Sequence, residues 1–280
     1  MIKSPAHEVR VRQPDWSARA ESVRQFDCSV IETSSEPPTD VDLFAKAQRI
    51  EQLLTDAYGE RVWRRDDYDT DLTGALVATI LSQNTSDLNS GRAFLSLKAA
   101  FPGGWDAVRR APVKDVADAI RSGGLADIKA PRIQRVLQLV FETHGRTDLQ
   151  HLAEWTDEDI RVYLRGLPGV GAKTAACVLM FNLGRPALPV DTHVHRVAGR
   201  LGLIGPKVNA DKAHELLRAL VHDDQTYSFH VHLIEHGRRT CHAQRPACQD
   251  CPVIVECDYY RAGKNTAGGK IPKVKERRAL

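Results

Sequence analysis

The amino-acid sequence predicts an all-helical protein. From residue 42 onward, apolar residues return at spacings of three and four, the pattern of a helix with one buried face. No stretch shows the period of two that a half-buried strand requires, and no segment repeats. The 280 residues, 42% hydrophobic and 27% charged, are ordinary for a globular protein with one large or two smaller domains.

The elements are taken in chain order. Residues 1–40 mix charged residues, Ser and Thr with the pair Pro37–Pro38, so we expect a flexible extension there. The first helix begins at Asp42 and ends at Gly59, with an apolar face of Leu43, Ala47, Ile50, Leu54 and Ala57. Further helices are expected at 72–81, 88–100, 113–120, 131–142, 157–165, 172–182, 192–201, 210–221 and 228–236.

Two local signals define helix starts. Thr156 with Asp159 is a capping-box-like start, and Pro131 suits a first helical turn. Residues 261–280 contain seven Lys or Arg and one Glu, and the glycines and proline there argue against a helix. We expect a flexible basic tail that adds general affinity for a polyanion.

Charge alone does not identify a partner. The formal net charge is +3, and residues 41–260 hold 27 basic and 28 acidic residues. If this part of the chain binds nucleic acid, it must do so through a local basic face.

The most informative segment is residues 167–191, LPGVGAKTAACVLMFNLGRPALPVD. Gly169 and Gly171 are expected to form a tight turn with positive φ, just before a helix that carries Lys173. Free amides at such a turn bind an anion such as a phosphate. Asp191 follows Lys173 by 18 residues.

A second informative segment holds four of the six cysteines within 17 residues, Cys241, Cys248, Cys251 and Cys257. Thiols at this density bind a metal centre or form two disulfides. No secretory signal and no apolar run of 18 residues is visible, so we expect an intracellular protein and a metal centre. Zinc sites more often show two C-x2-C pairs, and this segment has one, so a cubane iron–sulfur cluster fits better.

Taken together, these segments resemble the endonuclease III family of DNA glycosylases, in the helix-hairpin-helix superfamily. The resemblance covers residues 41–260. It includes ILSQNTSD at 80–87, GLADIKAPRI at 124–133, LPGVGAKTA at 167–175, VDTHVHRV at 190–197, EHGRRTC at 235–241 and the four cysteines. A hairpin alone is weak evidence, but the ordered set of hairpin, Lys, Asp and four Cys is specific.

The resemblance implies two helical domains with DNA bound in the cleft between them. A six-helix barrel with the hairpin spans residues 67–186. The iron–sulfur domain combines residues 41–66 with 187–260. Lys173 and Asp191 then face each other across the cleft.

The resemblance implies that Lys173 is the nucleophile. A neutral amine can attack the sugar C1′, displace the base and leave a Schiff base, after which β-elimination cuts the strand. Asp191 is the carboxylate that stabilises the sugar cation and moves protons. Asp191 also precedes a helix, so an N-cap is an alternative role that is compatible with catalysis.

The remaining DNA contacts also come from the resemblance. The loop Gly169, Val170, Gly171 binds phosphate without reading sequence. A glycosylase flips its target nucleotide out of the stack, and loop residues fill the gap. The candidates are Asn84 with the neighbouring Gln83, and Leu125 as a wedge, for which a small core contact is the alternative.

Other residues follow the family pattern or depart from it. His193 matches the pattern and is expected near the site, whereas His195 is expected to be structural or on the surface. Asn84 stands where relatives usually carry Gln, and Arg165 where they often carry an acidic residue.

The four clustered cysteines are the implied ligands of a [4Fe-4S] cluster. The cluster loop is expected to support DNA binding by Arg238, Arg239 and Arg245. Of the other two cysteines, we expect Cys177 to be a buried small side chain and Cys28 to be incidental.

The sequence therefore predicts a bifunctional DNA glycosylase and AP lyase of base-excision repair. It is expected to act as a monomer on double-stranded DNA with damaged pyrimidines or abasic sites, in the cytoplasm or nucleoid if bacterial. The alternatives are a monofunctional mismatch glycosylase of the same superfamily and a non-catalytic iron–sulfur DNA-binding protein. Lys173 argues against the first, and Lys173 with Asp191 against the second.

Overall fold

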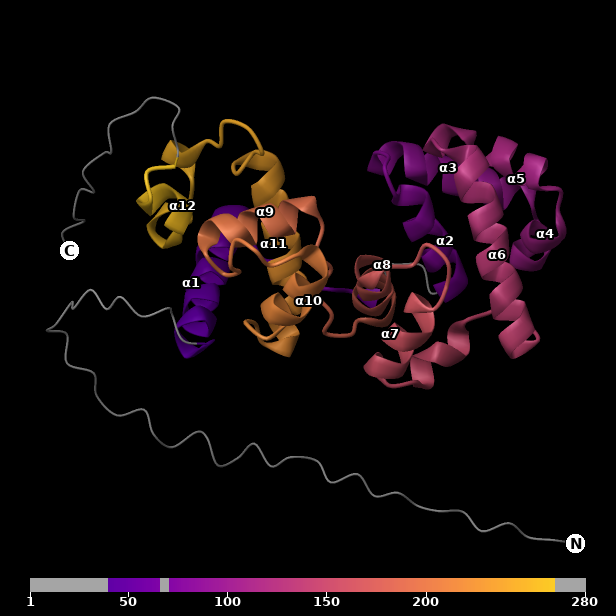
Figure 1. The fold of residues 1–280 in the computed structure, drawn as a ribbon, viewed down its shortest axis with the longest axis horizontal. Coiled ribbons are helices and arrows are strands. Elements are labelled where there is room, and N and C mark those ends of the chain that lie inside the picture. Colours follow the sequence, from indigo (N-terminus) through magenta and orange to yellow (C-terminus); the bar gives the residue numbers. More distant parts are fainter. Residues whose placement is uncertain (1–39, 66–70, 265–280) are drawn as a thin grey trace, which may run out of the picture. The chain divides into compact units, whose positions relative to one another are not determined.

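The computed structural model describes residues 40–65 and 71–264 (Figure 1). Every regular element in these two ranges is helical, which confirms the predicted fold class. The predicted extension, apart from Asp40, lies outside the described residues, as do Cys28 and residues 265–280 of the predicted basic tail.

The α-helices follow one another with short connections. In chain order they are α1 (Asp40–Tyr58), α2 (Leu72–Ser82), α3 (Asp87–Ala100), α4 (Gly104–Arg110), α5 (Val113–Ala119), α6 (Ala126–His144), α7 (Asp157–Arg165), α8 (Ala172–Cys177), α9 (Thr192–Leu201), α10 (Ala210–Arg218), α11 (Thr226–Arg239) and α12 (Asp258–Arg261). Figure 1 shows α2 to α8 in one group and α1 with α9 to α12 in another.

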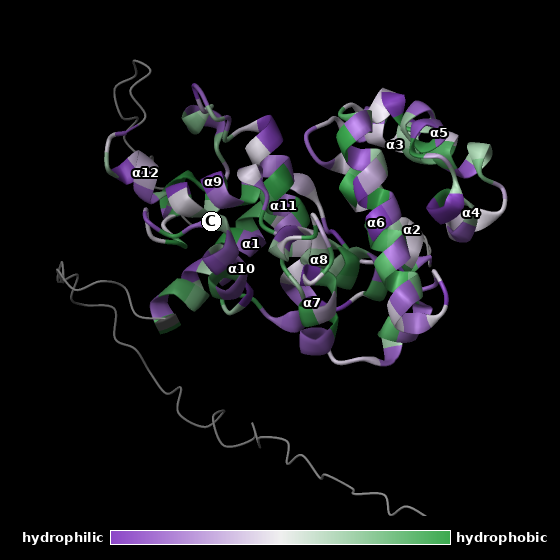
Figure 2. Ribbon diagram, turned by 45° about the vertical axis from the view of Figure 1, so that its right-hand side comes forward, coloured by the Kyte–Doolittle hydropathy of each residue, from purple (hydrophilic) through white to green (hydrophobic). Residues whose placement is uncertain are grey.

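Each group has its own apolar core. The first core takes its side chains from residues 72–187, and α2 is its central helix, since most of its residues are buried. The second core joins Ala47, Ile50 and Leu54 of α1 to buried residues of α9, α10 and α11. The surface helices carry hydrophobic residues toward these cores and hydrophilic residues elsewhere, as α6 shows in Figure 2.

The N-terminal end of α6 corrects one prediction. The helix begins at Ala126 and not at Pro131, which lies inside it. The start is set by Leu125, whose left-handed backbone (φ 51°, ψ 36°) turns the chain into the helix. Pro131 therefore removes one backbone donor within the helix, and does not occupy a first turn, where that donor is dispensable.

The predicted helix at 172–182 is divided into two kinds of turn. The α-helix α8 ends at Cys177, and Val178–Asn182 continues as a π-helix. A π-helical turn shifts the helix face that follows it, and such turns are frequent at functional sites.

Helix α4 and the start of α7 are two further points at which the structure tests the predicted elements. The short helix α4 was not predicted, since seven residues with one buried apolar side chain give no clear period. The capping box at Thr156 is confirmed, because its Oγ1 accepts a hydrogen bond from the Asp159 amide (3.2 Å). No described helix is both long enough and apolar enough to cross a membrane.

Candidate active site

The hairpin between α7 and α8 has one glycine with positive φ, not two. Gly169 has φ +79°, as predicted. Gly171 has φ −94° and ψ −178°, an extended conformation that any residue adopts, so the prediction of positive φ there is wrong. Gly171 is instead the N-cap of α8, and a Cβ built on it meets nothing within 4 Å. Its missing side chain leaves open space in front of the helix.

Within the hairpin, Val170 anchors the turn. Its side chain is buried in the first core, and its N–H already donates to the Leu167 carbonyl (3.1 Å). The amides left available for a phosphate are therefore those of the two glycines and of the first turn of α8, where helix donors lack partners within the helix.

Lys173 and Asp191 occupy two helix starts that follow each other in the chain. Lys173 is exposed in the first turn of α8. Asp191 is the N-cap of α9, where its Oδ1 accepts a hydrogen bond from the Val194 amide (2.7 Å). The cap uses Oδ1, so Oδ2 is the oxygen that remains for chemistry.

Lys173 and Asp191 both affect the pKa of two less accessible groups, Cys177 and His230. Burial of the thiol raises the pKa of Cys177 to about 11; Lys173 lowers it and Asp191 raises it. Burial lowers the pKa of His230 to about 4; Asp191 raises it and Lys173 lowers it. The candidate amine and the candidate carboxylate therefore both act electrostatically on the same two side chains.

His230 was not found from the sequence. It lies on α11, only 2% exposed, with its ring against Phe181, and its Nδ1 has no hydrogen-bond partner among the described residues. A histidine in a sequence carries no sign of its burial, and the resemblance did not include this position. Only the folded structure shows that His230 lies near the candidate site.

The two candidate gap-filling loops place different residues at their tips. The Gln83 amide is used within the protein, because Nε2 donates to the Gly169 carbonyl (3.1 Å). Asn84 is exposed with φ 55°, and Leu125 is 50% exposed with φ 51°. Leu125 is therefore not a core residue, and Asn84 is the loop residue that faces outward.

Both histidines of the VDTHVHRV segment are tied to neighbours. His193 Nδ1 lies 3.1 Å from Arg196 Nη2, and its Cβ packs closely against Gly237 of α11. His195 Nε2 lies 2.8 Å from the Val208 carbonyl oxygen, in agreement with the structural role expected for it.

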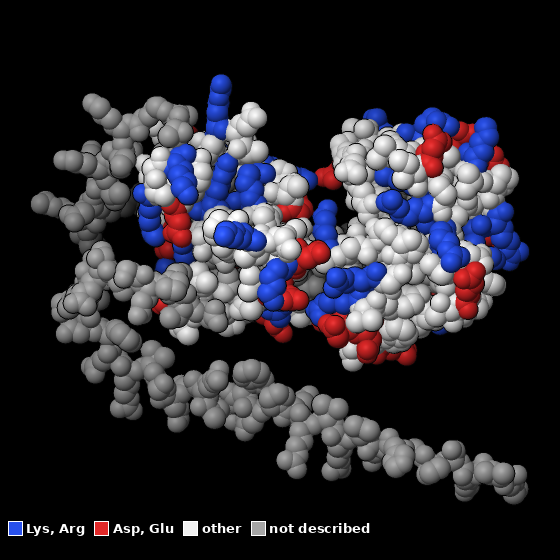
Figure 3. Space-filling model, viewed as in Figure 1, with Lys and Arg blue, Asp and Glu red and all other residues white. Residues whose placement is uncertain are grey.

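Lys and Arg gather over the surface of α9, α11 and α12 on the face drawn in Figure 3. The three predicted DNA-contact arginines differ in their surroundings. Arg238 pairs with Asp87 of α3 (3.1 Å), Arg239 pairs with Glu235 (2.7 Å), and Arg245 is exposed with φ 50°. Because both pairs lie at the surface, they hold the two side chains only weakly.

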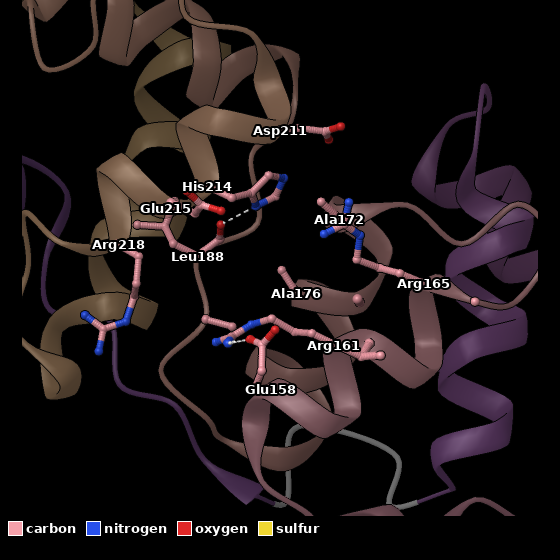
Figure 4. Close-up of a pocket in the computed structure, with 14 residues that line it drawn as sticks. Glu158, Arg161, Arg165, Ala172, Ala176, Leu188, Asp211, His214, Glu215 and Arg218 are labelled. Carbon is pink, nitrogen blue, oxygen red and sulfur yellow. Dashed lines mark hydrogen bonds and ion pairs between the residues drawn. The ribbon is translucent and has the colours of Figure 1, made fainter.

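Arg165 lines a pocket between α7, α8 and α10 (Figure 4). Opposite it, His214 Nδ1 lies 2.8 Å from the Leu188 carbonyl oxygen, and mainly burial, with a contribution from Arg165, lowers the pKa of His214. Neither Lys173 nor Asp191 lines this pocket, although Ala172 does.

The four clustered cysteines line one cavity, together with Arg200, His236 and Tyr259. All four are free thiols. Arg200 Nη1 donates to Cys241 Sγ (3.2 Å), and Cys251 Sγ lies 3.7 Å from His236 Nε2. Burial raises the pKa of Cys251 to about 12.

In the described part of the chain, no group of three His, Cys, Asp or Glu side chains is placed to hold a metal ion. A [4Fe-4S] cluster takes four cysteines around one body, and four free thiols around one cavity are that donor set.

Comparison with known proteins agrees with the fold and the motifs. Residues 77–222 match the model of the HhH-GPD superfamily base excision DNA repair protein. A candidate DNA glycosylase of Arabidopsis thaliana is 37% identical over 188 residues, a match that covers 64% of each chain. Endonuclease III of Thermotoga maritima is 34% identical over 197 residues, covering 70% of this chain and 87% of the relative.

A solved structure shows the same fold. It is a trapped endonuclease III–DNA covalent intermediate, with TM-score 0.64 and 26% identity, and the match covers 81% of this chain and 100% of that one. The chain therefore belongs to the HhH-GPD superfamily of base excision DNA repair proteins and, within it, to the endonuclease III family of DNA glycosylases and AP lyases.

Proposed function

We propose that this protein removes damaged pyrimidines from duplex DNA and then cuts the abasic strand by β-elimination, with Lys173 as nucleophile. The observation that carries the proposal is the placement of Lys173 in the first turn of α8, directly after the glycine hairpin, and of Asp191 at the start of α9, the next α-helix. An amine and a carboxylate next to a phosphate-binding hairpin supply the groups that this chemistry needs.

The proposed reaction proceeds in two stages. The neutral Nζ of Lys173 attacks C1′, the bond from C1′ to the base breaks, and the base leaves with the electron pair and takes up a proton. The nitrogen lone pair then opens the sugar ring and forms the Schiff base. Loss of a C2′ proton and departure of the 3′ phosphate cut the strand.

Asp191 is proposed to act on charge and on protons. Its carboxylate stabilises the positive charge that develops on the sugar as the base departs. Through Oδ2 it accepts the proton that the attacking amine releases and returns it later in the reaction. The cap bond from Oδ1 to the Val194 amide fixes the carboxylate in place for both tasks.

Double-stranded DNA is the proposed partner. The hairpin amides take the phosphate, Asn84 and Leu125 enter the gap left by the everted nucleotide, and Arg238, Arg239 and Arg245 add contacts to the backbone. We propose further that the enzyme works inside the cell as a monomer.

A [4Fe-4S] cluster is the proposed resident group. Cys241, Cys248, Cys251 and Cys257 would hold it. When bound, it supplies structural organisation to the loop between α11 and α12, and the free energy of binding contributes to folding of that loop.

The direct test is strand nicking by wild type, Lys173→Gln and Lys212→Gln. The substrates are duplexes with thymine glycol, dihydrouracil, uracil, 8-oxoguanine or an abasic site. Lys212 is a surface lysine paired with Glu215 (2.6 Å) and serves as the matched control.

Wild type and Lys212→Gln are expected to nick the oxidised-pyrimidine and abasic duplexes, and Lys173→Gln to nick none. Base removal without nicking by wild type would favour a monofunctional glycosylase. Nicking by Lys173→Gln at the wild-type rate would exclude Lys173 from the role.

A further inference from the structure

Two side chains of α6 join the segments that the proposed function assigns to DNA. The first is Lys129, which is 2% exposed and is among the largest fully buried side chains in the described residues. Its Nζ donates to the Leu81 carbonyl (2.7 Å) and to the Gly123 carbonyl (2.9 Å). Leu81 lies in the last turn of α2, before the Asn84 loop, and Gly123 lies two residues before Leu125.

The Lys129 bonds meet a defined need at each loop. The last carbonyls of α2 have no partner within the helix, and an ammonium suits the negative end of a helix. A buried ammonium is tolerated only with hydrogen-bond acceptors, and here the carbonyls of Leu81, in the last turn of α2, and of Gly123, in the 3-10 turn before Leu125, supply them. Lys129 therefore holds the bases of the two gap-filling loops at a fixed separation.

Arg132 lies one turn further along α6 and reaches the third segment. Its Nη1 donates to Gln83 Oε1 (3.2 Å), and Gln83 Nε2 donates to the Gly169 carbonyl (3.1 Å). Arg132 also packs beneath the hairpin, because a Cβ built on Gly169 would lie 2.4 Å from Arg132 Cδ. Gln83 thus links α6 to the phosphate-binding turn.

The loop tips show why such support is needed. Asn84 and Leu125 are two of three described non-glycine residues with positive φ, and both are exposed. A left-handed non-glycine backbone is unfavourable by itself, most of all for a residue such as leucine, and persists where surrounding contacts determine it. The contacts on the loop bases come from Lys129 and Arg132.

We propose that Lys129 and Arg132 are positioning residues. They fix the loop that carries Leu125, the loop that carries Asn84 and the hairpin as one rigid unit, so that all three enter DNA together during nucleotide eversion. The inference rests on the proposed function, since it assigns these segments to the same event. Neither side chain touches the reacting atoms. Their effect is on the geometry in which Asn84 and Leu125 meet the gap.

The test follows eversion without chemistry. The probe is a duplex with a tetrahydrofuran abasic analogue and 2-aminopurine opposite it, whose fluorescence rises when the opposite base is unstacked. The analogue forms no Schiff base, so the signal does not depend on Lys173. Arg132→Met is the main variant, because Arg132 is only half-buried. Arg135→Met, on the exposed face of the same helix, is the matched control.

Arg132→Met is expected to slow the stopped-flow rise about tenfold, the order associated with loss of a hydrogen bond to a charged group. Arg135→Met, the thermal midpoint and affinity for undamaged duplex are expected to stay at wild-type values. Equal rates for all three proteins would overturn the inference. An equal loss of affinity for undamaged duplex would also overturn it, by making Arg132 a general phosphate contact.

A double-mutant cycle tests the route of coupling. If Arg132 acts through Gln83, the effects of Arg132→Met and Gln83→Met are non-additive, whereas additive effects would exclude that route. Lys129→Met, where it folds, is expected to slow the rise at least as much as Arg132→Met, and a wild-type rate would remove Lys129 from the role. Absence of borohydride trapping by wild type would contradict the proposed function alone, because the fluorescence rise needs no lysine chemistry.

Discussion

At the level of single residues, Asp191 combines a structural role with the chemical role proposed for it. Its Oδ1 caps α9 through the Val194 amide (2.7 Å). Asn caps a helix about as well as Asp, so Asp191→Asn is expected to keep the thermal midpoint while base excision falls by about 10²–10⁴-fold. Single-turnover excision and thermal unfolding measured on the same preparations check this.

Asp191→Ala provides the control. It removes the cap as well as the carboxylate, so it is expected to lose about 1 kcal/mol of stability in addition to activity. If Asp191→Asn retained excision within a few fold of wild type, the carboxylate would be a cap and nothing more.

The buried imidazole of His230 makes stability depend on pH. Burial lowers its pKa from 6.5 to about 4, so the unfolded chain takes up the proton first as pH falls. The His230 contribution to the free energy of unfolding is thus complete above pH 6.5 and is lost as pH falls toward about 4. Denaturant titrations across this window are expected to show the loss in wild type.

His230→Gln isolates that contribution. The amide does not titrate, so the variant is expected to lose less stability between neutral pH and pH about 4.5, by up to about 1.4 kcal/mol per pH unit. Parallel curves for the two proteins would show that His230 is not the titrating group.

Single residues also show how much of the candidate site can be predicted from the sequence. Lys173, Asp191 and the four cysteines are recognisable because their spacing along the chain is part of a motif. His230, Lys129 and Arg132 are not, because their roles come from burial and from partners that are distant in the chain, such as the Leu81 carbonyl, 48 residues from Lys129. Spacing assigns the family's Gln position to Asn84, but only the structure shows that Gln83 is bound to the Gly169 carbonyl whereas Asn84 is exposed.

At the level of elements, the hairpin separates two glycines by function. Gly169→Ala places a Cβ at φ +79° and 2.4 Å from Arg132 Cδ, so it is expected to lower the free energy of unfolding by about 1–2 kcal/mol. Gly171→Ala meets no neighbour and is expected to leave stability unchanged while weakening DNA binding. Denaturant unfolding and fluorescence anisotropy measure the two effects. Equal destabilisation by both substitutions would contradict this assignment.

Helix positions followed from the sequence better than helix ends did. The apolar period located α9 with both ends, because Asp191 and Gly202 are clear caps. It misplaced the start of α6, since nothing local reports that Leu125 adopts a left-handed backbone. It also missed the change to a π-helix at Val178, because both helix types place apolar residues on a similar face over a single turn.

The cluster loop gives a further prediction. The purified protein is expected to be yellow-brown, with about four iron and four sulfide per chain by elemental assay. Cys251→Ala is expected to reduce the iron content and solubility, and Cys177→Ala, outside the cavity, to leave the iron content unchanged. One zinc per chain without iron would contradict the assignment.

At the scale of the whole molecule, the first described helix packs with helices from the C-terminal part of the chain. Helix α1 packs with α9, α10 and α11 in the second core, while residues 72–187 build the first. The order of helices in the sequence does not by itself specify this arrangement. The two cores give each candidate catalytic group a separate support, with Lys173 on a helix of the first core and Asp191 at a helix start of the second.

The central claim is that Lys173 forms the covalent bond to DNA. The most direct test is borohydride reduction of wild-type protein on abasic duplex, followed by proteolysis and mass spectrometry of the adduct. We expect one trapped complex, with the sugar remnant on the peptide that contains Lys173 and none in Lys173→Gln. A remnant on any other lysine, or no adduct on abasic DNA, would contradict the claim.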